Sequence, residues 1–316
     1  MLAALPAPFV LAGCAALSPT PQSDALASSP AATAGLPDRV ELDAVPFFPQ
    51  TPYHCGPAAL ATVLVHAGYA QVTPEGLADR LFLPAREGTL QIEMLAAARR
   101  AGALPVVVPG ELASLLAEVA AQQPLVVLQN LGLAIAPRWH YAVLVGYDRD
   151  AREVLLRSGT TRREAMAFTL FERTWARGGR WAIATVRPGA LPATARETEA
   201  VEAAVGFERA VDSSSQRLLV FSSLLARWPD NLPALIGAGN AHAASNDWPR
   251  AAHSFERAAQ RHESAAAWHN LALARWSLGQ HEAARSAARR ALERANSAEP
   301  VWREAARKLV VQMGVP

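Results

Sequence analysis

Cys55 is one of two cysteines in the chain and stands in the segment "QTPYHCGPAALATVL", where a loop turns into a helix. Thiolate is the reactive form of cysteine, and the positive end of a helix dipole favours it, as do unpaired N–H groups. The position therefore predicts a lowered thiol pKa and a nucleophile. The alternative is a small buried hydrophobic residue, which is the commoner use of a lone cysteine.

A cysteine nucleophile needs a base, usually a histidine that the fold brings near. Five of the eight histidines lie in the second half of the chain, on variable or exposed positions of a helical pattern. His66 lies too far along the helix that starts at Cys55, and His54 adjoins the cysteine, where neighbouring side chains point apart. His140 remains, at the start of the strand-like run "HYAVLVGYD". The alternative for His140 is a loop histidine without a catalytic role.

The elements that must position these residues lie in residues 41–190. Apolar residues recur with a helical period over residues 57–67, and three shorter helical patterns follow. The period then changes to short apolar runs rich in β-formers, bounded by Pro, Gly or charged turns. These runs cover residues 124–130, 140–148, 153–158 and 181–187. Helices first and strands later predict an α+β domain with an antiparallel sheet.

Residues 191–316 are rich in Ala, Leu, Arg and Glu and predict an all-α region with internal repeats. The segments "ALIGAGNAHAASNDWPRAAHSFERA" and "AWHNLALARWSLGQHEAARSAARRAL" resemble tetratricopeptide repeats, with a fainter unit before them. Small residues such as Gly239, Ala251 and Ala272 are expected where two helices of a hairpin cross. Stacked repeats bury a shared core and expose a concave groove, so the resemblance implies a protein partner.

The first fourteen residues, "MLAALPAPFVLAGC", are apolar but too short for a spanning helix, which needs about 20 residues. Residues 1–14 therefore predict a targeting segment. Its end resembles the lipobox of bacterial lipoproteins, which implies lipid on Cys14 and a membrane anchor. The expected location is the bacterial cell envelope, on the periplasmic side of the outer membrane. The alternative is a signal peptide that happens to contain a cysteine.

Residues 15–40 are rich in Ala, Ser, Pro and Thr and predict a flexible linker. Some 25 such residues have a reach on the order of 30 Å, enough to hold a domain clear of a membrane. If Cys14 carries lipid, Cys55 is the only free thiol, so a disulfide within the mature domain is excluded.

Composition excludes several other classes of function. Lys and Arg number 30 against 28 Asp and Glu, and the basic residues are spread along the chain, which argues against a nucleic-acid partner. The sequence contains no CxxC or HExxH spacing, so no metal is expected. It also contains no phosphate-binding glycine motif, so no nucleotide cofactor is expected.

The glutamine, cysteine and histidine segments together resemble papain-like cysteine peptidases. More closely, residues 45–187 resemble the double-glycine (bacteriocin-processing) branch, through "VPFFPQTPYHCGPAALATVL", "HYAVLVGYD" and "FTLFERTW". The resemblance implies that Cys55 is the nucleophile, His140 the general base and Gln50 the side-chain donor of the oxyanion hole. One such donor lowers an acyl-transfer barrier by roughly 3 to 4 kcal/mol.

The resemblance places Ser158 where the family has an aspartate that orients the histidine. A hydroxyl accepts one hydrogen bond but carries no charge to stabilise an imidazolium. Asp148 is the nearest carboxylate in sequence, but eight residues of strand separate it from His140 by about 26 Å, so it is predicted only to make a turn. Either Ser158 or a backbone carbonyl orients the imidazole, or activity is weak.

Three hypotheses follow. The first is a lipid-anchored cysteine peptidase that cleaves a peptide or protein substrate, with a repeat module that binds a protein partner. The second is a catalytically weak or inactive papain-like scaffold, in which the repeats mediate protein–protein interaction. The third uses the same cysteine and histidine on a non-peptide acyl or amide substrate, which sequence does not separate from proteolysis.

Overall fold

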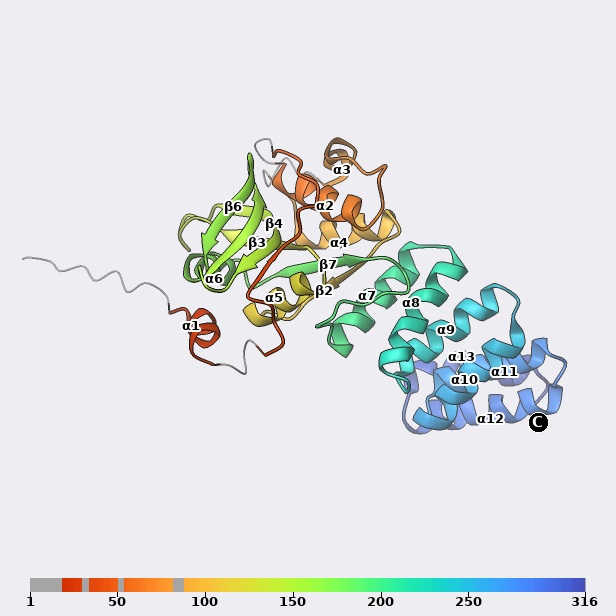
Figure 1. Ribbon diagram of the computed structural model, residues 1–316. Helices are drawn as coiled ribbons and strands as arrows, with labels where there is room; N and C mark the ends of the chain where they lie inside the picture. The colour runs from red at the N-terminus through yellow and green to blue at the C-terminus, as the bar shows by residue number, and fades with distance from the viewer. Residues whose placement is uncertain (1–18, 30–33, 51–53, 82–87, 316) are drawn as a thin grey trace, which may run out of the picture.

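The structure is a computed structural model that describes residues 19–29, 34–50, 54–81 and 88–315. The predicted targeting segment 1–14, with Cys14, lies outside the described residues. Figure 1 shows an N-terminal part built on a β-sheet and a C-terminal part that consists of a row of helices leading away from it. The predicted fold class, an α+β domain followed by an all-α domain, is confirmed. No helix in the described part of the chain is long and apolar enough to cross a membrane.

The sheet has seven strands, and every pairing in it is antiparallel. Its order is β2-β7-β3-β4-β5-β6, and β1 pairs with β4 beside this path. The strands are β1 (Arg39–Glu41), β2 (Leu104–Val107), β3 (Leu125–Asn130), β4 (Trp139–Asp148), β5 (Glu153–Ser158), β6 (Thr161–Ala167) and β7 (Ala182–Val186). The four apolar runs in the sequence became β3, β4, β5 and β7, whereas β1, β2 and β6 carried too little pattern to be predicted.

Strand β4 is the central strand, because it pairs with β3, β5 and β1. Its residues from Tyr141 to Tyr147 are buried, as expected for a strand covered on both faces. Gly146 lies at a register shift opposite β5, where a Cβ atom would come within 2.6 Å of the Val40 carbonyl oxygen. Glycine at this position therefore lets β1 approach the central strand.

The N-terminal part also contains the helices α2 (Cys55–His66), α3 (Pro74–Leu81), α4 (Gln91–Arg100), α5 (Leu112–Ala120) and α6 (Phe168–Arg177). Helix α2 packs against β4, α3 and α4. The sequence predicts an amphipathic helix here, but all of residues 56–64 are buried. A helix enclosed by a sheet on one side and other helices elsewhere has no solvent face, so α2 is a central helix.

The predicted linker is wrong for part of residues 15–40, because helix α1 (Pro21–Ser28) docks on the N-terminal part. The buried carboxylate of Glu172 accepts hydrogen bonds from the Ser23 amide at 2.7 Å, the Ser23 hydroxyl at 2.6 Å and the Gln22 amide at 3.1 Å. The first N–H groups of a helix have no partner within the helix, and an anion satisfies them well. A polar, low-complexity composition therefore did not prevent ordered docking.

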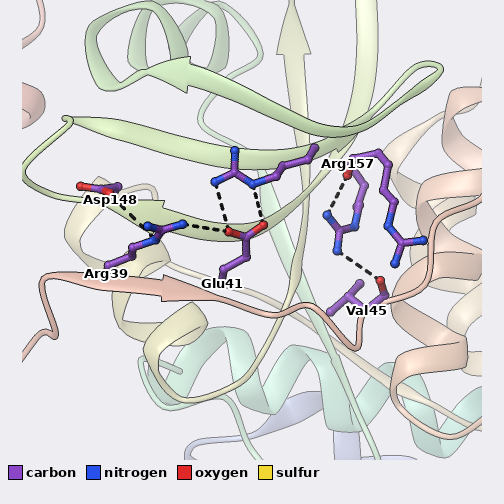
Figure 2. Close-up of polar contacts among 7 residues, drawn as sticks. Arg39, Glu41, Val45, Asp148 and Arg157 are labelled. Atoms are coloured by element: carbon purple, nitrogen blue, oxygen red, sulfur yellow. Dashed lines mark hydrogen bonds and ion pairs between the residues drawn. The ribbon is translucent and has the colours of Figure 1, made fainter.

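Strand β1 overlaps the end of the predicted linker, and Figure 2 shows its polar contacts. Glu41 accepts two hydrogen bonds from the Arg163 guanidinium, at 2.8 and 3.1 Å, and this contact lowers the pKa of the Glu41 carboxyl. Arg39 lies 3.9 Å from the carboxylate of Asp148. The neighbouring Arg157 guanidinium is buried and donates to the carbonyl oxygen of Val45 at 3.4 Å.

The C-terminal part is a stack of helical hairpins. Its helices are α7 (Glu197–Ala210), α8 (Ser214–Arg227), α9 (Leu232–Ala244), α10 (Trp248–His262), α11 (Ala265–Ser277), α12 (His281–Ser297) and α13 (Arg303–Gln312), with a short 3₁₀ turn at Pro300–Trp302. A Cβ atom on Gly239 would come within 2.4 Å of the Phe255 ring, so the helices α9 and α10 cross at a glycine, as predicted. Ala251 and Ala272 are fully buried.

The helical stack shares a hydrophobic core with the sheet. Leu104 and Val106 of β2 and Val186 of β7 form one buried cluster with Phe207 of α7 and Phe221 of α8. Helix α7 covers the edge strand β2. The change from sheet to helical stack falls between Val186 and Glu197. The two parts are therefore fixed to each other through packed side chains rather than joined by a free linker.

Candidate active site

The beginning of β4 gathers the residues that the sequence singles out. The Gln50 side chain donates from Nε2 to the Tyr141 carbonyl oxygen at 3.1 Å. Its Oε1 accepts the Gly159 amide at 3.1 Å, and the Gln50 amide donates to the Gly159 carbonyl at 2.9 Å. Gln50 thus fills the gap between β4 and the end of β5, with its side chain fixed at both polar atoms.

Cys55 is the first residue of α2 and is half-buried. The backbone N–H of Tyr141 interacts with its sulfur. Because the Tyr141 nitrogen is bonded to the carbonyl carbon of His140, this contact brings the sulfur to the His140 end of β4. Gly56 permits this position, since a Cβ atom there would come within 2.8 Å of the Thr89 side chain.

His140 Nε2 and the Ser158 hydroxyl lie 2.9 Å apart, within hydrogen-bond distance. Ser158 is the last residue of β5, on the strand next to β4. A hydrogen bond at Nε2 fixes the plane of the imidazole and leaves Nδ1 for a second partner. The structure therefore brings Ser158, the position that the resemblance gives to the third residue, to the histidine.

Among the hydrogen bonds of the described residues, none joins the Cys55 sulfur to the His140 imidazole. The sulfur interacts with the backbone next to His140 instead. Catalytic hydrogen bonds are often long in unliganded sites and tighten when substrate binds. The sulfur and the imidazole therefore lie at the same end of β4 without a direct hydrogen bond between them.

The ionisation of the two groups differs from the sequence-based expectation. Burial raises the pKa of the Cys55 thiol, although the backbone N–H groups of Tyr141, Gly56 and Cys55 itself act to lower it. The predicted lowering at the helix start is therefore wrong in direction, because loss of solvation outweighs the helix terminus. Burial also lowers the pKa of His140, which nearby Glu164 partly offsets. At pH 7 both shifts favour a neutral thiol and a neutral imidazole.

This ionisation predicts a broad pH optimum with low thiol reactivity. The pKa of His140 is lowered from 6.5 and that of Cys55 is raised from 9.0. At any pH between the two pKa values, the cysteine and histidine together carry one dissociable proton. Activity should rise as pH increases through the first value and fall only above the second. Alkylation of Cys55 by iodoacetamide should still be rising at pH 9, since it requires the thiolate. An alkylation rate that has already reached its plateau at about pH 4 would instead indicate a preformed thiolate–imidazolium ion pair.

Four backbone groups in the site were not predicted from the sequence: the N–H and carbonyl of Tyr141 and the N–H and carbonyl of Gly159. The peptide groups on either side of Tyr141 contact Gln50 and Cys55, and the Gly159 backbone holds Gln50. The only sequence signal was the turn-forming Gly159 after β5, which has a positive φ of 56°. Asp148 accepts the Ala151 amide at 2.9 Å, so it makes the turn after β4, as predicted.

In the described part of the chain, no group of three or more His, Cys, Asp or Glu side chains could hold a metal ion.

Known proteins resemble both parts of the chain. A crystal structure described as a C39-like peptidase from Bacillus anthracis aligns with 48% of this chain and 98% of its own, at 21% identity and a TM-score of 0.40. The Sgt2 TPR domain from Aspergillus fumigatus aligns with 37% of this chain and 76% of its own, at 19% identity and a TM-score of 0.33. The comparison with curated proteins found no match. By sequence, residues 42–183, which contain Gln50, Cys55, His140 and Ser158, match the family described as Peptidase_C39 like family.

Proposed function

We propose that the protein is a cysteine peptidase in which Cys55 is the nucleophile and His140 the general base. The observation that carries the proposal is the gathering of Gln50, Cys55 and Ser158 around the His140–Tyr141 segment of β4. The family match over residues 42–183 supports the same chemistry. The helical stack is proposed to bind a protein partner or the substrate protein.

The proposed reaction begins from the neutral pair. As the Cys55 sulfur attacks the scissile carbonyl carbon, its proton passes to His140, and the carbonyl oxygen becomes an oxyanion. The Gln50 amide has two N–H donors, of which the Tyr141 oxygen takes one, so the second is available to the oxyanion. The Cys55 backbone N–H, in the first turn of α2, is a second donor.

The remaining steps regenerate the enzyme. His140 returns its proton to the leaving amine as the C–N bond breaks, which leaves a thioester on Cys55. A water molecule then gives a proton to His140 and attacks the thioester carbon. The sulfur leaves, takes the proton back from His140, and releases a carboxylic acid product.

Mass spectrometry of a peptide mixture incubated with the purified full-length protein tests this function. We expect new peptide termini to form in the presence of EDTA, and an acyl group on Cys55 in acid-quenched samples. The Cys55→Ala variant should produce neither. If wild-type protein and this variant give the same peptides, the proposal is wrong.

Ser158 offers a graded test of how His140 is oriented. Ser158→Ala should lower kcat/KM by about threefold to tenfold, since one neutral hydrogen bond contributes about 0.5–1.5 kcal/mol. Ser158→Asp should raise the pKa of His140, because a carboxylate nearby shifts a pKa by about 1–3 units. Alkylation of Cys55 at pH 7 should then be about tenfold faster or more. Ser277→Asp, on the exposed surface of α11, is the matched charge control. Equal rates in all four proteins would exclude Ser158 as the orienting residue.

A second candidate function is a catalytically weak or inactive scaffold whose repeats bind a protein. Two observations favour it: the uncharged Ser158 at His140, and the raised pKa of Cys55. Both slow thioester formation without removing the residues that perform it. A kcat/KM that does not differ between wild-type protein and Cys55→Ala, together with retained partner binding, would identify this function.

We also propose that Cys14 carries lipid and anchors the protein in the cell envelope. The support is the sequence Leu11-Ala12-Gly13-Cys14, which lies outside the described residues. Metabolic labelling with a fatty acid should mark the wild-type protein and not Cys14→Ser. Labelling of both would refute the assignment.

A further inference from the structure

Strand pairing places Glu164 on the same face of the sheet as His140. Side chains alternate along a strand, so His140 and Leu144, four residues apart on β4, lie on one face. Leu144 pairs with Leu156 of β5, and Leu156 pairs with Glu164 of β6. Directly opposite residues on paired strands share a face. The imidazole and the Glu164 carboxylate therefore lie on one side of the sheet, with β5 between their strands.

Side-chain contacts on the same face agree with this placement. Gln129 of β3 is the register partner of His140. Its Nε2 donates to the hydroxyl of Thr174 on α6 at 2.7 Å and to the sulfur of Met166 at 3.5 Å. Met166 stands two residues after Glu164 on β6, so both have the same orientation on that strand. The face that carries His140 is thus the face that carries Glu164.

Glu164 is free to act on its surroundings. Its side chain is half-buried, and within the described residues its carboxylate forms no hydrogen bond or ion pair. The neighbouring Arg163 is engaged on the other face of β6, where it donates to Glu41 at 2.8 and 3.1 Å. No nearby cation therefore neutralises the charge of Glu164 by direct contact in this part of the structure.

Two charged side chains act on the His140 imidazole in opposite directions. Burial lowers the pKa of His140 most, the Glu164 carboxylate raises it, and the Arg138 guanidinium lowers it by less than Glu164 raises it. On α6, Glu172 is bound to α1, and Arg177 donates to a carbonyl of β3. Glu164 is thus the carboxylate whose charge reaches the imidazole.

We propose that Glu164 is a positioning residue of the site, whose negative charge gives the His140 imidazolium the stabilisation that the neutral Ser158 hydroxyl does not supply. The proposal rests on the proposed peptidase function. When Cys55 passes its proton to His140, the ring becomes positive, and a negative charge on the same face lowers the energy of that state. Ser158 holds the ring by its contact with Nε2 at 2.9 Å. Orientation and charge are thus supplied by two residues on two strands.

The spacing of the strands sets the size of the effect. Strands β4 and β6 are two strand spacings apart, which is about 10 Å. At this distance a unit charge shifts a pKa by about 0.3 unit in water and by about 1.2 units at the effective dielectric constant of a protein surface. These values correspond to a factor of about two to fifteen in the equilibrium between imidazole and imidazolium.

An NMR titration measures this charge effect without turnover. Full-length protein with Cys55→Ala carries histidine labelled with ¹³C at Cε1, and the His140 signal is identified by its absence in His140→Ala. Glu164→Gln should lower the His140 pKa by about 0.3 to 1.2 units. Glu164→Ala should give the same shift, since it removes the same charge with a side chain of different shape.

The matched control for the titration is Glu153→Gln. Glu153 is also a half-buried glutamate of the sheet, but it pairs with Asp148 at the far end of β4. Its replacement should shift the His140 pKa by less than about 0.2 unit, because the charge is about 26 Å away along the strand.

Kinetics and a rescue variant separate a charge effect from a structural one. In the catalytic background, Glu164→Gln should lower kcat by about twofold to fifteenfold with little change in KM. The acidic limb of the pH profile should move to lower pH, because the neutral imidazole is the active base and its pKa falls. Adding Ser158→Asp to Glu164→Gln should move this limb back toward higher pH. Loss of structure alone would produce neither shift.

Two outcomes refute different parts of the proposal. An unchanged His140 pKa in both Glu164→Gln and Glu164→Ala, in a protein that cleaves peptides, would refute the role of Glu164 and leave the peptidase. A lowered His140 pKa in these variants, when the wild-type protein cleaves no peptide, would refute the peptidase and leave only the charge interaction.

Discussion

Replacing His140 by alanine should lower kcat/KM for peptide cleavage by about 10²- to 10⁴-fold, the usual contribution of a general acid–base group. The cause is specific to this site. Burial raises the pKa of Cys55, so little thiolate exists at pH 7 and the sulfur must lose its proton during attack. Without the imidazole, neither this proton transfer nor protonation of the leaving amine has a partner. Steady-state kinetics on a peptide that the wild-type protein cleaves would measure the loss.

The control for this prediction is His253→Ala, because His253 is exposed on α10 in the helical stack. Circular dichroism should show that both variants keep their helical content. The double variant Cys55→Ala, His140→Ala should be no slower than Cys55→Ala alone, since residues that act as a unit are not additive. Activity of His140→Ala within a factor of two of wild type would contradict the pairing of these residues.

Replacing Phe207 by alanine should destabilise the protein by about 3–5 kcal/mol, the usual cost of removing a buried aromatic side chain. Phe207 is fully buried in the core that α7 shares with Leu104 and Val106 of β2. Its loss leaves a cavity between the sheet and the helical stack. Because both parts line this cavity, the loss should lower the unfolding midpoint of both.

Urea unfolding followed by two probes checks this second prediction. Far-ultraviolet circular dichroism reports mainly on the helices, and alkylation of the half-buried Cys55 reports on the N-terminal part. Both midpoints should fall together in Phe207→Ala. Val311→Ala, at an exposed residue of α13, should change stability by less than about 0.5 kcal/mol. Two separated transitions, with only one shifted, would show that the parts fold independently.

Much of the sheet could be predicted because its inner strands carry long apolar runs. The outer strands could not: β6 bears Arg162, Arg163 and Glu164, which protect a sheet edge but do not look like a strand. Strand β2 has only four residues, and its burial depends on α7. Which strand lies at the edge of the sheet, and which helix covers that edge, depends on tertiary packing. The local sequence pattern does not contain this information.

Cys55 and His140 could be singled out from the sequence because each stands beside a clear element boundary, whereas the roles of Gln50 and Ser158 came only from the family resemblance. Cys55 begins a helix, His140 stands near the start of a strand, and Ser158 ends the next strand. The ionisation of Cys55 could not be predicted in the same way. It depends on how much solvent the surrounding fold excludes. This burial raises the thiol pKa by more than the N–H groups near the helix start lower it, and only the helix start is visible in the sequence.

The docking of α1 on Glu172 shortens the segment between the proposed lipid site, Cys14, and the folded part of the chain. Gln22, whose side chain and amide are both hydrogen-bonded to the fold, is eight positions after Cys14. A chain of this length extends at most about 28 Å. If Cys14 is inserted in a bilayer as proposed, the folded protein stays within about this distance of the lipid surface. Under the proposed peptidase function, its substrates must then lie equally close to that surface, as membrane-bound proteins or as chains that emerge from the bilayer.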